Sequence, residues 1–384
     1  MIDIFNVFNV LSEEEKIVWE TARKFVDEEL MPIMGEYFDK GDFPVHLIKR
    51  MGELGLFGVS LPEEYGCPGL SEIAYGLVMH EMERADSGIR TFSSVQTSLV
   101  MYPIYRFGSE EQKRKWLPKL AVGDTVGCFA LTEADFGSDP VGMETKAVRD
   151  GDSFIINGSK MWITNGNIAD IAIVWAKLDG EFQAFIIEKG TPGFSAKEIR
   201  GKVPIRLSVT SELYFDNCKI PKENILPDAN NFKAALMCLN QARYSIAWGA
   251  LGAATACYED ALQYSKERIQ FDKPIASFQL IQTKLAYMVN EITKAQLILM
   301  QLGKLKDKGE EKYFQVSLAK MNNVEKALEI SRLARDILGA SGIVVENNVI
   351  RHVCNLEAVN TYEGTFDIQS LILGRLVTGI SAFK

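Results

Sequence analysis

One carboxylate lies in a short segment whose residue types could carry chemistry. Glu363 stands between Tyr362 and Gly364, with Thr365 next in the chain, directly before a run of apolar residues. A side-chain carboxylate can act as a general base once its pKa is tuned toward the working pH. Taken alone, however, the segment is typical of a helix start, in which Glu363 is an N-terminal acid and Thr365 a cap.

Three further segments combine residue types that could bind a ligand. Residues 131–140 bring hydroxyl groups and glycine into a turn, and residues 160–165 set Trp162 beside a hydroxyl donor. Residues 267–274 include Arg268, at the end of an expected helix. Each segment also has a simpler interpretation, because polar turns stabilise themselves, a lone Trp is more often core, and a helix-ending Arg usually complements the helix dipole.

The sequence argues against several other kinds of site. It has no G-x-G-x-x-G after a strand and no phosphate-binding G-x-x-x-x-G-K-[ST] loop. Its six cysteines are scattered without a C-x-x-C pair, so no metal site is expected and the thiols are interpreted as core residues. A net charge of −9 and a pI near 5.2 disfavour nucleic-acid binding. The start of the chain lacks a signal-peptide pattern and no stretch approaches the ~20 apolar residues of a membrane span, so a cytoplasmic location without membrane insertion is expected.

The elements that must position these segments fall into three parts. Ser12 and Glu15 form a capping box before an amphipathic helix, and helices are predicted at 46–56, 73–84 and 110–120. From residue 123 the chain predicts short strands instead, separated by Asp-Gly hairpin turns at residues 150–151 and 179–180. The strands are expected at 127–131, 153–156, 171–176 and 182–187.

After residue 240 helical periodicity returns over long stretches. Two long antiparallel helices are predicted, followed by a third at 313–338 and a fourth from residue 364 to the C-terminus, which together make a four-helix bundle. The expected domains are therefore a helical domain at 1–122, a β-domain at 123–235 and the bundle at 236–384.

Taken together and in this order, the four segments resemble the acyl-CoA dehydrogenase family. The shared patterns are L-T-E-x-x-x-G-S-D, W-I-T-N, R-x-Q-F and Y-E-G-T, and the resemblance covers essentially the whole chain. It implies a mainly α fold with a central β-barrel-like domain between the N-terminal α-domain and the C-terminal bundle. It also implies FAD between the β-domain and the bundle, an acyl-CoA substrate, electron-transferring flavoprotein as electron partner, and a homotetramer built as a dimer of dimers.

The resemblance also implies roles for individual residues. Glu363 would take the α-proton of the acyl chain while the flavin accepts the β-hydride, and the Glu363 backbone N–H would bind the thioester oxygen. Ser138, Asn240 and Arg243 match positions that contact CoA. The turn near Arg268 would lie at a dimer interface, so that FAD touches two subunits. The residues expected to bind FAD are Phe129, Leu131, Thr132, Trp162, Thr164, Arg268, Phe271, Gln279, Gly339 and Thr365.

Within the family, residues 87–90, 94–100, 240–244 and 355–365 are similar to the glutaryl-CoA dehydrogenase subgroup. This likeness implies that Arg90 faces the distal carboxylate of the acyl chain, that the product is decarboxylated to crotonyl-CoA, and that three further side chains complete the substrate contacts, namely Glu83, Ser94 and Tyr362.

Several alternatives stay open on the sequence alone. The substrate could be a neutral short or cyclic acyl-CoA, or the reaction could stop at glutaconyl-CoA without loss of CO2. An acyl-CoA oxidase is a further possibility, since the sequence does not show how oxygen is excluded. A non-catalytic binding subunit would require loss of the base, and Glu363 is present.

Overall fold

The computed structural model describes residues 2–383, and the chain forms three parts that follow the predicted order. The first part is helical. Its first helix begins at the predicted capping box, in which Ser12 accepts from Glu15 N–H and the Glu15 side chain accepts from Ser12 N–H. Its α-helices are α1 (Glu13–Phe25), α2 (Met31–Lys40), α3 (Ile48–Glu53), α4 (Glu72–Ala85), α5 (Ser87–Ser94), α6 (Tyr102–Phe107) and α7 (Glu110–Ala121).

Two of the three further helices predicted in this part are found at α4 and α7, whereas the helix predicted at 46–56 is shorter. A 3-10 turn at Val45–Leu47 precedes α3, which ends at Glu53. The sequence does not predict α5 or the π-helical segment η5 (Val95–Met101) that follows it. Both are buried on all sides, so they lack the polar face that makes a helix recognisable from its sequence.

The middle part is a seven-stranded, curled sheet. Its order is β1-β4-β2-β3-β7-β6, with β5 paired to β4. The predicted Asp-Gly turns join β2 to β3 and β4 to β5, and Asp179 and Gly180 both have the positive φ that such a turn requires. The strands are β1 (Gly127–Ala130), β2 (Lys146–Asp150), β3 (Ser153–Thr164), β4 (Ile171–Leu178), β5 (Glu181–Glu188), β6 (Phe194–Glu198) and β7 (Thr210–Pro221).

The third part is the helical bundle, built on α8 (Phe232–Glu267), α9 (Gln279–Asp307) and α10 (Tyr313–Leu338). The predicted domain limit at residue 235 lies inside α8, which begins after its Asn231 cap. The sequence does not predict α11 (Asn348–Val359), because polar side chains of Arg351, His352 and Asn355 are buried on its inner face and hide the apolar period. The last helix, α12 (Phe366–Thr378), begins two residues after the predicted start.

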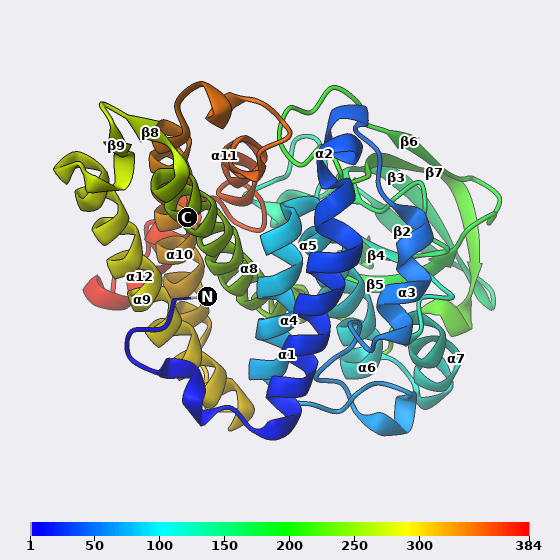
Figure 1. Ribbon diagram of the computed structural model, residues 1–384. Helices are drawn as coiled ribbons and strands as arrows, with labels where there is room; N and C mark the ends of the chain where they lie inside the picture. Colours follow the sequence, from blue (N-terminus) through cyan, green and yellow to red (C-terminus); the bar gives the residue numbers. More distant parts are fainter. Residues whose placement is uncertain (1, 384) are drawn as a thin grey trace.

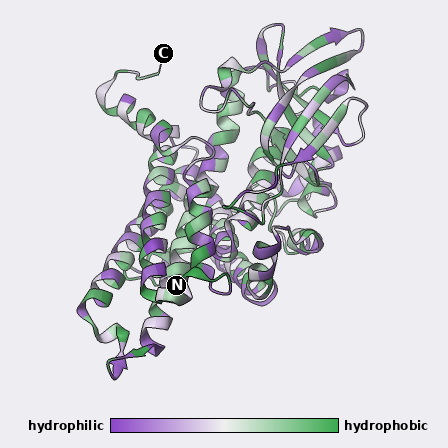
Figure 2. Ribbon diagram, turned by 90° about the horizontal axis from the view of Figure 1, so that it is seen from above, coloured by the Kyte–Doolittle hydropathy of each residue, from purple (hydrophilic) through white to green (hydrophobic). Residues whose placement is uncertain are grey.

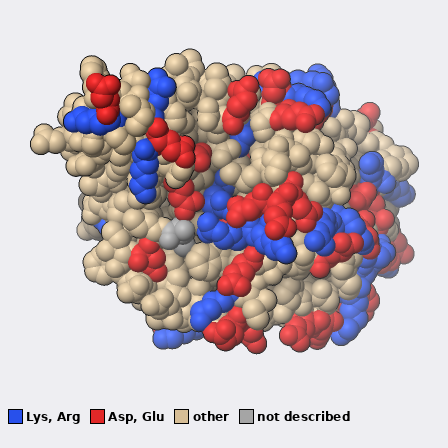
Figure 3. All heavy atoms as spheres, in the orientation of Figure 1, with Lys and Arg blue, Asp and Glu red and all other residues tan. Residues whose placement is uncertain are grey.

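The three parts lie side by side, with the N-terminal helices between the sheet and the bundle (Figure 1). The long helices of the bundle carry polar and apolar residues on different faces (Figure 2). A two-stranded hairpin, β8 (Ile269–Gln270) and β9 (Lys273–Pro274), connects α8 to α9. On the face shown in Figure 3, acidic and basic side chains are interspersed. No helix within residues 2–383 is long and apolar enough to cross a membrane.

Candidate active site

Glu363 lies in the loop between α11 and α12, in a backbone conformation that an ordinary residue avoids. Its φ is 52°, and Gly364 follows with φ 91°. The left-handed region costs a residue with a side chain about 1–2 kcal/mol, so other contacts must hold this segment. Glu363 is half-buried, and its buried Oε2 atom has no hydrogen-bond partner among the described residues. The loop therefore presents a buried carboxylate oxygen that is free to accept a proton.

Three cations surround this carboxylate from three different helices. Burial raises the pKa of Glu363, while the charges of Arg90, Arg243 and Lys320 oppose that rise. Arg243 also holds the loop directly, since its Nε donates to the Glu363 carbonyl oxygen at 2.8 Å. Gln369 Nε2 donates to the same oxygen at 3.3 Å. The structure thus places Arg243 against the base segment, and its predicted contact with CoA stays a prediction.

Arg90 stands at the centre of a polar cluster in which Glu83, Arg90 and Ser94 are fully buried and Tyr362 is half-buried. Its Nε donates to Glu83 Oε2 at 2.5 Å and its Nη1 to Ser94 Oγ at 3.1 Å. Its Nη2 donates to the hydroxyl of Tyr362, the residue before Glu363. Burial alone would lower the pKa of Arg90, but the Glu83 carboxylate raises it, so the guanidinium stays charged. The four residues predicted to surround the distal end of the acyl chain, Glu83, Arg90, Ser94 and Tyr362, therefore lie together.

Arg90 keeps part of its donor capacity in this arrangement. A guanidinium has five N–H groups, and Glu83, Ser94 and Tyr362 accept from three of them on three different nitrogens. Among the described residues, one N–H on each terminal nitrogen is left without an acceptor. A pair of such N–H groups is the donor set that a carboxylate accepts from an arginine.

Gly249 on α8 makes room for this cluster. A Cβ atom at this position would lie 1.9 Å from Glu83 Oε2 and 3.0 Å from Arg90 Nε. No side chain fits at that distance, so α8 can pass the ion pair only as glycine.

We expect Gly249→Ala to lower the stability of the folded protein by about 1–3 kcal/mol, because the methyl group must displace a buried, paired carboxylate. Thermal unfolding measures this effect. Gly374→Ala is the matched control, since a Cβ there meets nothing within 4 Å and alanine is the better helix former. An unchanged Tm for Gly249→Ala, with Gly374→Ala also unchanged, would contradict the expectation.

The residues predicted to hold the flavin ring lie at one place on the sheet. Trp162 is 55% exposed at φ 64°, beside an irregularity in the pairing of β3 with β7 between Lys160 and Ile163. Thr132 is adjacent, because its carbonyl oxygen accepts from Met161 N–H at 2.9 Å. Thr164 closes the same strand. A large, flat side chain turned out of a sheet beside two hydroxyl groups fits a ring system stacked against it.

The buried Lys160 stabilises the part of the structure that carries Trp162 and Thr132. Its buried Nζ donates to the Leu131 carbonyl and to Glu133 Oε1, both at 2.9 Å. Burial lowers the pKa of Lys160 to about 8, with the Glu133 carboxylate opposing that shift. Phe129 lies in β1 with its ring edge-on to Trp175, so it belongs to the core under the predicted flavin site.

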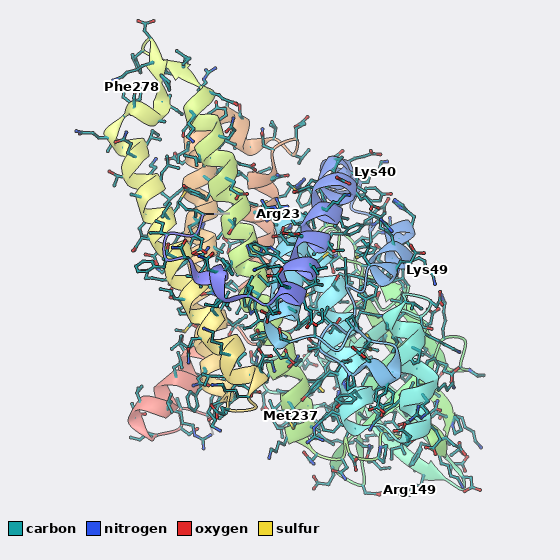
Figure 4. All side chains as sticks on the ribbon, turned by 60° about the horizontal axis from the view of Figure 1, so that its bottom comes forward. Arg23, Lys40, Lys49, Arg149, Met237 and Phe278 are labelled. Carbon is teal, nitrogen blue, oxygen red and sulfur yellow. The ribbon has the colours of Figure 1, made fainter. Side chains whose placement is uncertain are left out.

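The structure does not bring all predicted FAD residues together within one chain. Arg268, Phe271 and Gln279 lie at the β8–β9 hairpin, and Phe271 is 85% exposed. Arg243 and Arg268 are separated by 25 residues of one continuous helix, or about 37 Å. The hairpin, marked by Phe278, and α12 lie at opposite ends of the bundle (Figures 1 and 4). Gly339, also exposed, follows the end of α10.

Three predicted residues, Ser138, Asn240 and Thr365, lie on three different elements. Ser138 is exposed on the loop after β1, and Asn240, on α8, carries a buried Oδ1 without a hydrogen-bond partner among the described residues. Thr365 is the N-cap of α12, with its hydroxyl oxygen accepting from Ile368 N–H at 3.3 Å. It borders a hollow of about 380 Å³ that is also lined by Glu325, Asn360, Thr361, Phe366 and Asp367.

Two residues that shape the site, Lys320 and Gly249, are not among those predicted from the sequence. Lys320 had a signal, because it interrupts the apolar face of the helix predicted at 313–338, and a charged residue on such a face needs a buried partner. Gly249 had no such signal, because a glycine within a helix does not indicate from the sequence which other helix packs against it. No cluster of three or more His, Cys, Asp or Glu residues able to hold a metal occurs in the described part of the chain.

Three family models match consecutive parts of this chain. The acyl-CoA dehydrogenase N-terminal domain matches residues 12–124, the middle domain residues 128–218 and the C-terminal domain residues 232–378. Together they span the helical part, the sheet and the bundle.

Known proteins that are similar to this chain belong to the same family as these models. Human mitochondrial short-chain specific acyl-CoA dehydrogenase is 37% identical over 369 residues, which cover 94% of this chain and 90% of that protein. Glutaryl-CoA dehydrogenase from Mycobacterium smegmatis is similar in two crystal structures. One is 50% identical with a TM-score of 0.96, covering 98% of this chain and 97% of its own, and the other, in complex with FADH2, is 48% identical with a TM-score of 0.97, covering 99% and 98%.

A third solved structure, titled electron transferring flavoprotein of Acidaminococcus fermentans, contains a chain that is 36% identical with a TM-score of 0.93, covering 96% of this chain and 98% of its own. The exposed Trp162, its neighbouring hydroxyl groups and the unpaired buried oxygens of Glu363 and Asn240 fit a site whose cofactor is FAD and whose substrate is an acyl-CoA. The chain belongs to the acyl-CoA dehydrogenase family.

Proposed function

We propose that this enzyme oxidises glutaryl-CoA and decarboxylates the product to crotonyl-CoA and CO2. The observation that carries the substrate is Arg90, a buried guanidinium that contacts the residue next to Glu363 and retains an N–H on each terminal nitrogen. A cation at that place is of no use to an apolar acyl end, whereas the distal carboxylate of a glutaryl chain can accept from both nitrogens. The likeness to glutaryl-CoA dehydrogenases supports the same substrate.

The reaction begins with removal of a proton from the carbon next to the thioester. Glu363 takes this proton, because its Oε2 atom is buried and has no other partner in the described structure. Burial raises the pKa of Glu363, which makes the carboxylate a stronger base, while three cations keep it ionised before substrate binds. The backbone N–H of Glu363 stabilises the negative charge that develops on the thioester oxygen.

FAD, when bound, supplies the acceptor for the two electrons that leave the β-carbon as hydride. Thr132, Trp162 and Thr164 would hold its ring on the sheet, and Thr365 would contact it from the side of the Glu363 loop. The hairpin with Arg268, Phe271 and Gln279, together with Gly339, is too far away in the same chain. These residues would meet the FAD of a second subunit, which requires a dimer within the proposed homotetramer.

Decarboxylation follows from the position of the second carboxylate. After oxidation the C–C bond to this carboxylate lies next to a double bond conjugated with the thioester, so its electrons can move into that system as CO2 leaves. The resulting dienolate takes back one proton, which protonated Glu363 holds, and crotonyl-CoA forms. Electron-transferring flavoprotein then accepts the electrons, and the cytoplasm is the proposed location of the enzyme.

The direct experiment mixes the holoenzyme with glutaryl-CoA without oxygen, while flavin absorbance and product mass are followed. Bleaching of the flavin with formation of crotonyl-CoA supports the whole proposal. Glutaconyl-CoA as the only product would overturn the decarboxylation step. Faster bleaching by butyryl-CoA than by glutaryl-CoA would instead favour a short-chain acyl-CoA dehydrogenase, as the relationship to the human short-chain enzyme allows.

Tyr362→Phe is expected to affect decarboxylation more than oxidation, because the Tyr362 hydroxyl accepts from Arg90 within the network around the distal carboxylate. We expect glutaconyl-CoA to accumulate while the flavin still bleaches. The ratio of the two products, measured by mass, checks this. Tyr244→Phe is the matched control, since its buried hydroxyl donates to the Glu72 carbonyl outside the network, and its ratio is expected to stay at the wild-type value. An unchanged ratio in Tyr362→Phe would count against the role of its hydroxyl.

A further inference from the structure

Lys320 is a buried cation on α10 that faces the segment carrying Glu363. Its side chain is 1% exposed, and its Nζ donates to the carbonyl oxygen of Tyr362 at 2.8 Å and to that of Gly364 at 2.6 Å. Burial lowers the pKa of Lys320 to about 7, although the Glu363 carboxylate opposes the shift. The two carbonyls flank Glu363, so one ammonium group holds the backbone on both sides of it.

These contacts fix the direction of a backbone N–H as well as a carbonyl. The carbonyl of Tyr362 and the N–H of Glu363 belong to one planar trans peptide and point in opposite directions. Lys320 holds that carbonyl, so the N–H of Glu363 must point away from α10. Among the described residues this N–H has no acceptor. A donor that is fixed in direction and lacks a partner is preorganised for a ligand.

The middle carbonyl of the segment is held separately. Arg243 Nε donates to the Glu363 carbonyl oxygen, so three consecutive carbonyls, those of Tyr362, Glu363 and Gly364, all accept from buried cationic side chains. Glu363 has φ 52° and Gly364 φ 91°, a pair that relaxes unless its peptide planes are restrained. Lys320 supplies the restraint on two of the three planes.

We propose that Lys320 is the positioning residue of the catalytic segment, and that by holding the carbonyls of Tyr362 and Gly364 it aims both the carboxylate and the N–H of Glu363 at the substrate thioester. The inference rests on the proposed role of Glu363 as the base. Lys320 does not touch the acyl chain and acts through the backbone of its neighbours.

The charge of Lys320 gives the proposal a readout that packing alone would not move. The ionisable groups facing Glu363 are the cations Arg90 on α5, Arg243 on α8 and Lys320 on α10, together with the Glu83 carboxylate, which is paired with Arg90. Burial raises the pKa of Tyr362, so its phenol stays neutral. The cations lower the pKa of Glu363. Removing one of them must therefore raise that pKa and shift the acid limb of the rate to higher pH.

The test compares Lys320→Met and Lys320→Gln with wild type as FAD-loaded enzymes, by anaerobic flavin reduction across a pH series. For Lys320→Met we expect the reduction rate to fall about 10- to 100-fold with little change in KM, because the reacting groups are misaimed while substrate still binds. The midpoint of the acid limb should rise by about one pH unit. Lys320→Gln keeps a donor without the charge, so it should recover part of the rate and retain the shift.

Asn323→Leu is the matched control, because Asn323 lies one turn further along α10 and its buried Nδ2 donates to the Ala247 carbonyl at 3.1 Å. It is expected to lower the Tm without moving the acid limb. An acid limb that stays at the wild-type midpoint in the Lys320 variants would overturn the proposal, whatever happens to the rate. If Lys320→Met fails to fold with FAD, Lys320→Gln decides the same question.

The outcome stays separable from the proposed substrate. The comparison uses the acyl-CoA that reduces the wild-type flavin fastest. If wild type fails to react with glutaryl-CoA alone, the proposed substrate is overturned, and the role of Lys320 is then measured with butyryl-CoA. If Glu363→Gln keeps wild-type activity, the base assignment falls and the role of Lys320 falls with it.

Discussion

Glu363→Gln is expected to lower the rate of flavin reduction by a factor approaching about 10⁴, the upper range for loss of a general base, while FAD and the fold are retained. The amide has nearly the shape of the carboxylate and cannot take the proton. The Glu363 Oε2 has no hydrogen-bond partner in the described structure, so the substitution breaks no hydrogen bond of that atom. Anaerobic mixing with an acyl-CoA measures the rate, and the flavin absorbance spectrum and Tm report the fold.

The matched control for this substitution is Glu357→Gln. Glu357 is an exposed carboxylate on α11, six residues before Glu363, and among residues 2–383 its ion-pair partner is the exposed Arg332. We expect the control to reduce its flavin at the wild-type rate, because the loss of a surface ion pair changes stability by at most about 1 kcal/mol. Reduction of the Glu363→Gln flavin at a rate near that of wild type would remove Glu363 from the role of base.

Arg90→Ala is expected to lower kcat/KM for glutaryl-CoA by roughly two to four powers of ten, because loss of one partner of a buried charge pair typically costs about 3–5 kcal/mol. Butyryl-CoA has no distal carboxylate, so its turnover should stay similar or improve. The decisive quantity is the ratio of the two kcat/KM values, because any general loss of active enzyme cancels in it. A proportional loss on both substrates would make Arg90 a structural residue and leave a generic short-chain acyl-CoA dehydrogenase.

Arg90→Ala also leaves the buried Glu83 carboxylate without its cation. Two further variants separate this effect from the loss of the contact with the substrate carboxylate. The double variant Arg90→Ala with Glu83→Gln removes the unpaired charge, and the ratio between substrates should remain shifted in it. Arg84→Ala is the matched control. Arg84 is a buried arginine next to Glu83 on α4, but it pairs with Glu81 and Asp27. We expect it to lower the Tm and leave the substrate ratio at its wild-type value.

Local patterns in the sequence were sufficient for much of the fold. The capping box of Ser12 and Glu15, the Asp-Gly turns and the long apolar periods of the bundle depend on residues a few positions apart, and the structure confirms each of them. The order of the parts follows from these elements, and the family resemblance named Glu363 and Arg90 from short segments around them. The predicted roles of these residues are still to be tested.

The arrangement of the site was decided only by the tertiary structure. Arg90 and Tyr362 are 272 residues apart in the chain, and Arg243 and Glu363 are 120 apart, so no local period links them. The buried helix α5 shows no polar face, Gly249 matters because another helix crosses it, and Lys320 reaches the Glu363 loop because α10 packs against that loop. Turns and caps are determined by neighbours in sequence, whereas these contacts exist only where packing brings distant helices together, and that is why the sequence by itself did not reveal them.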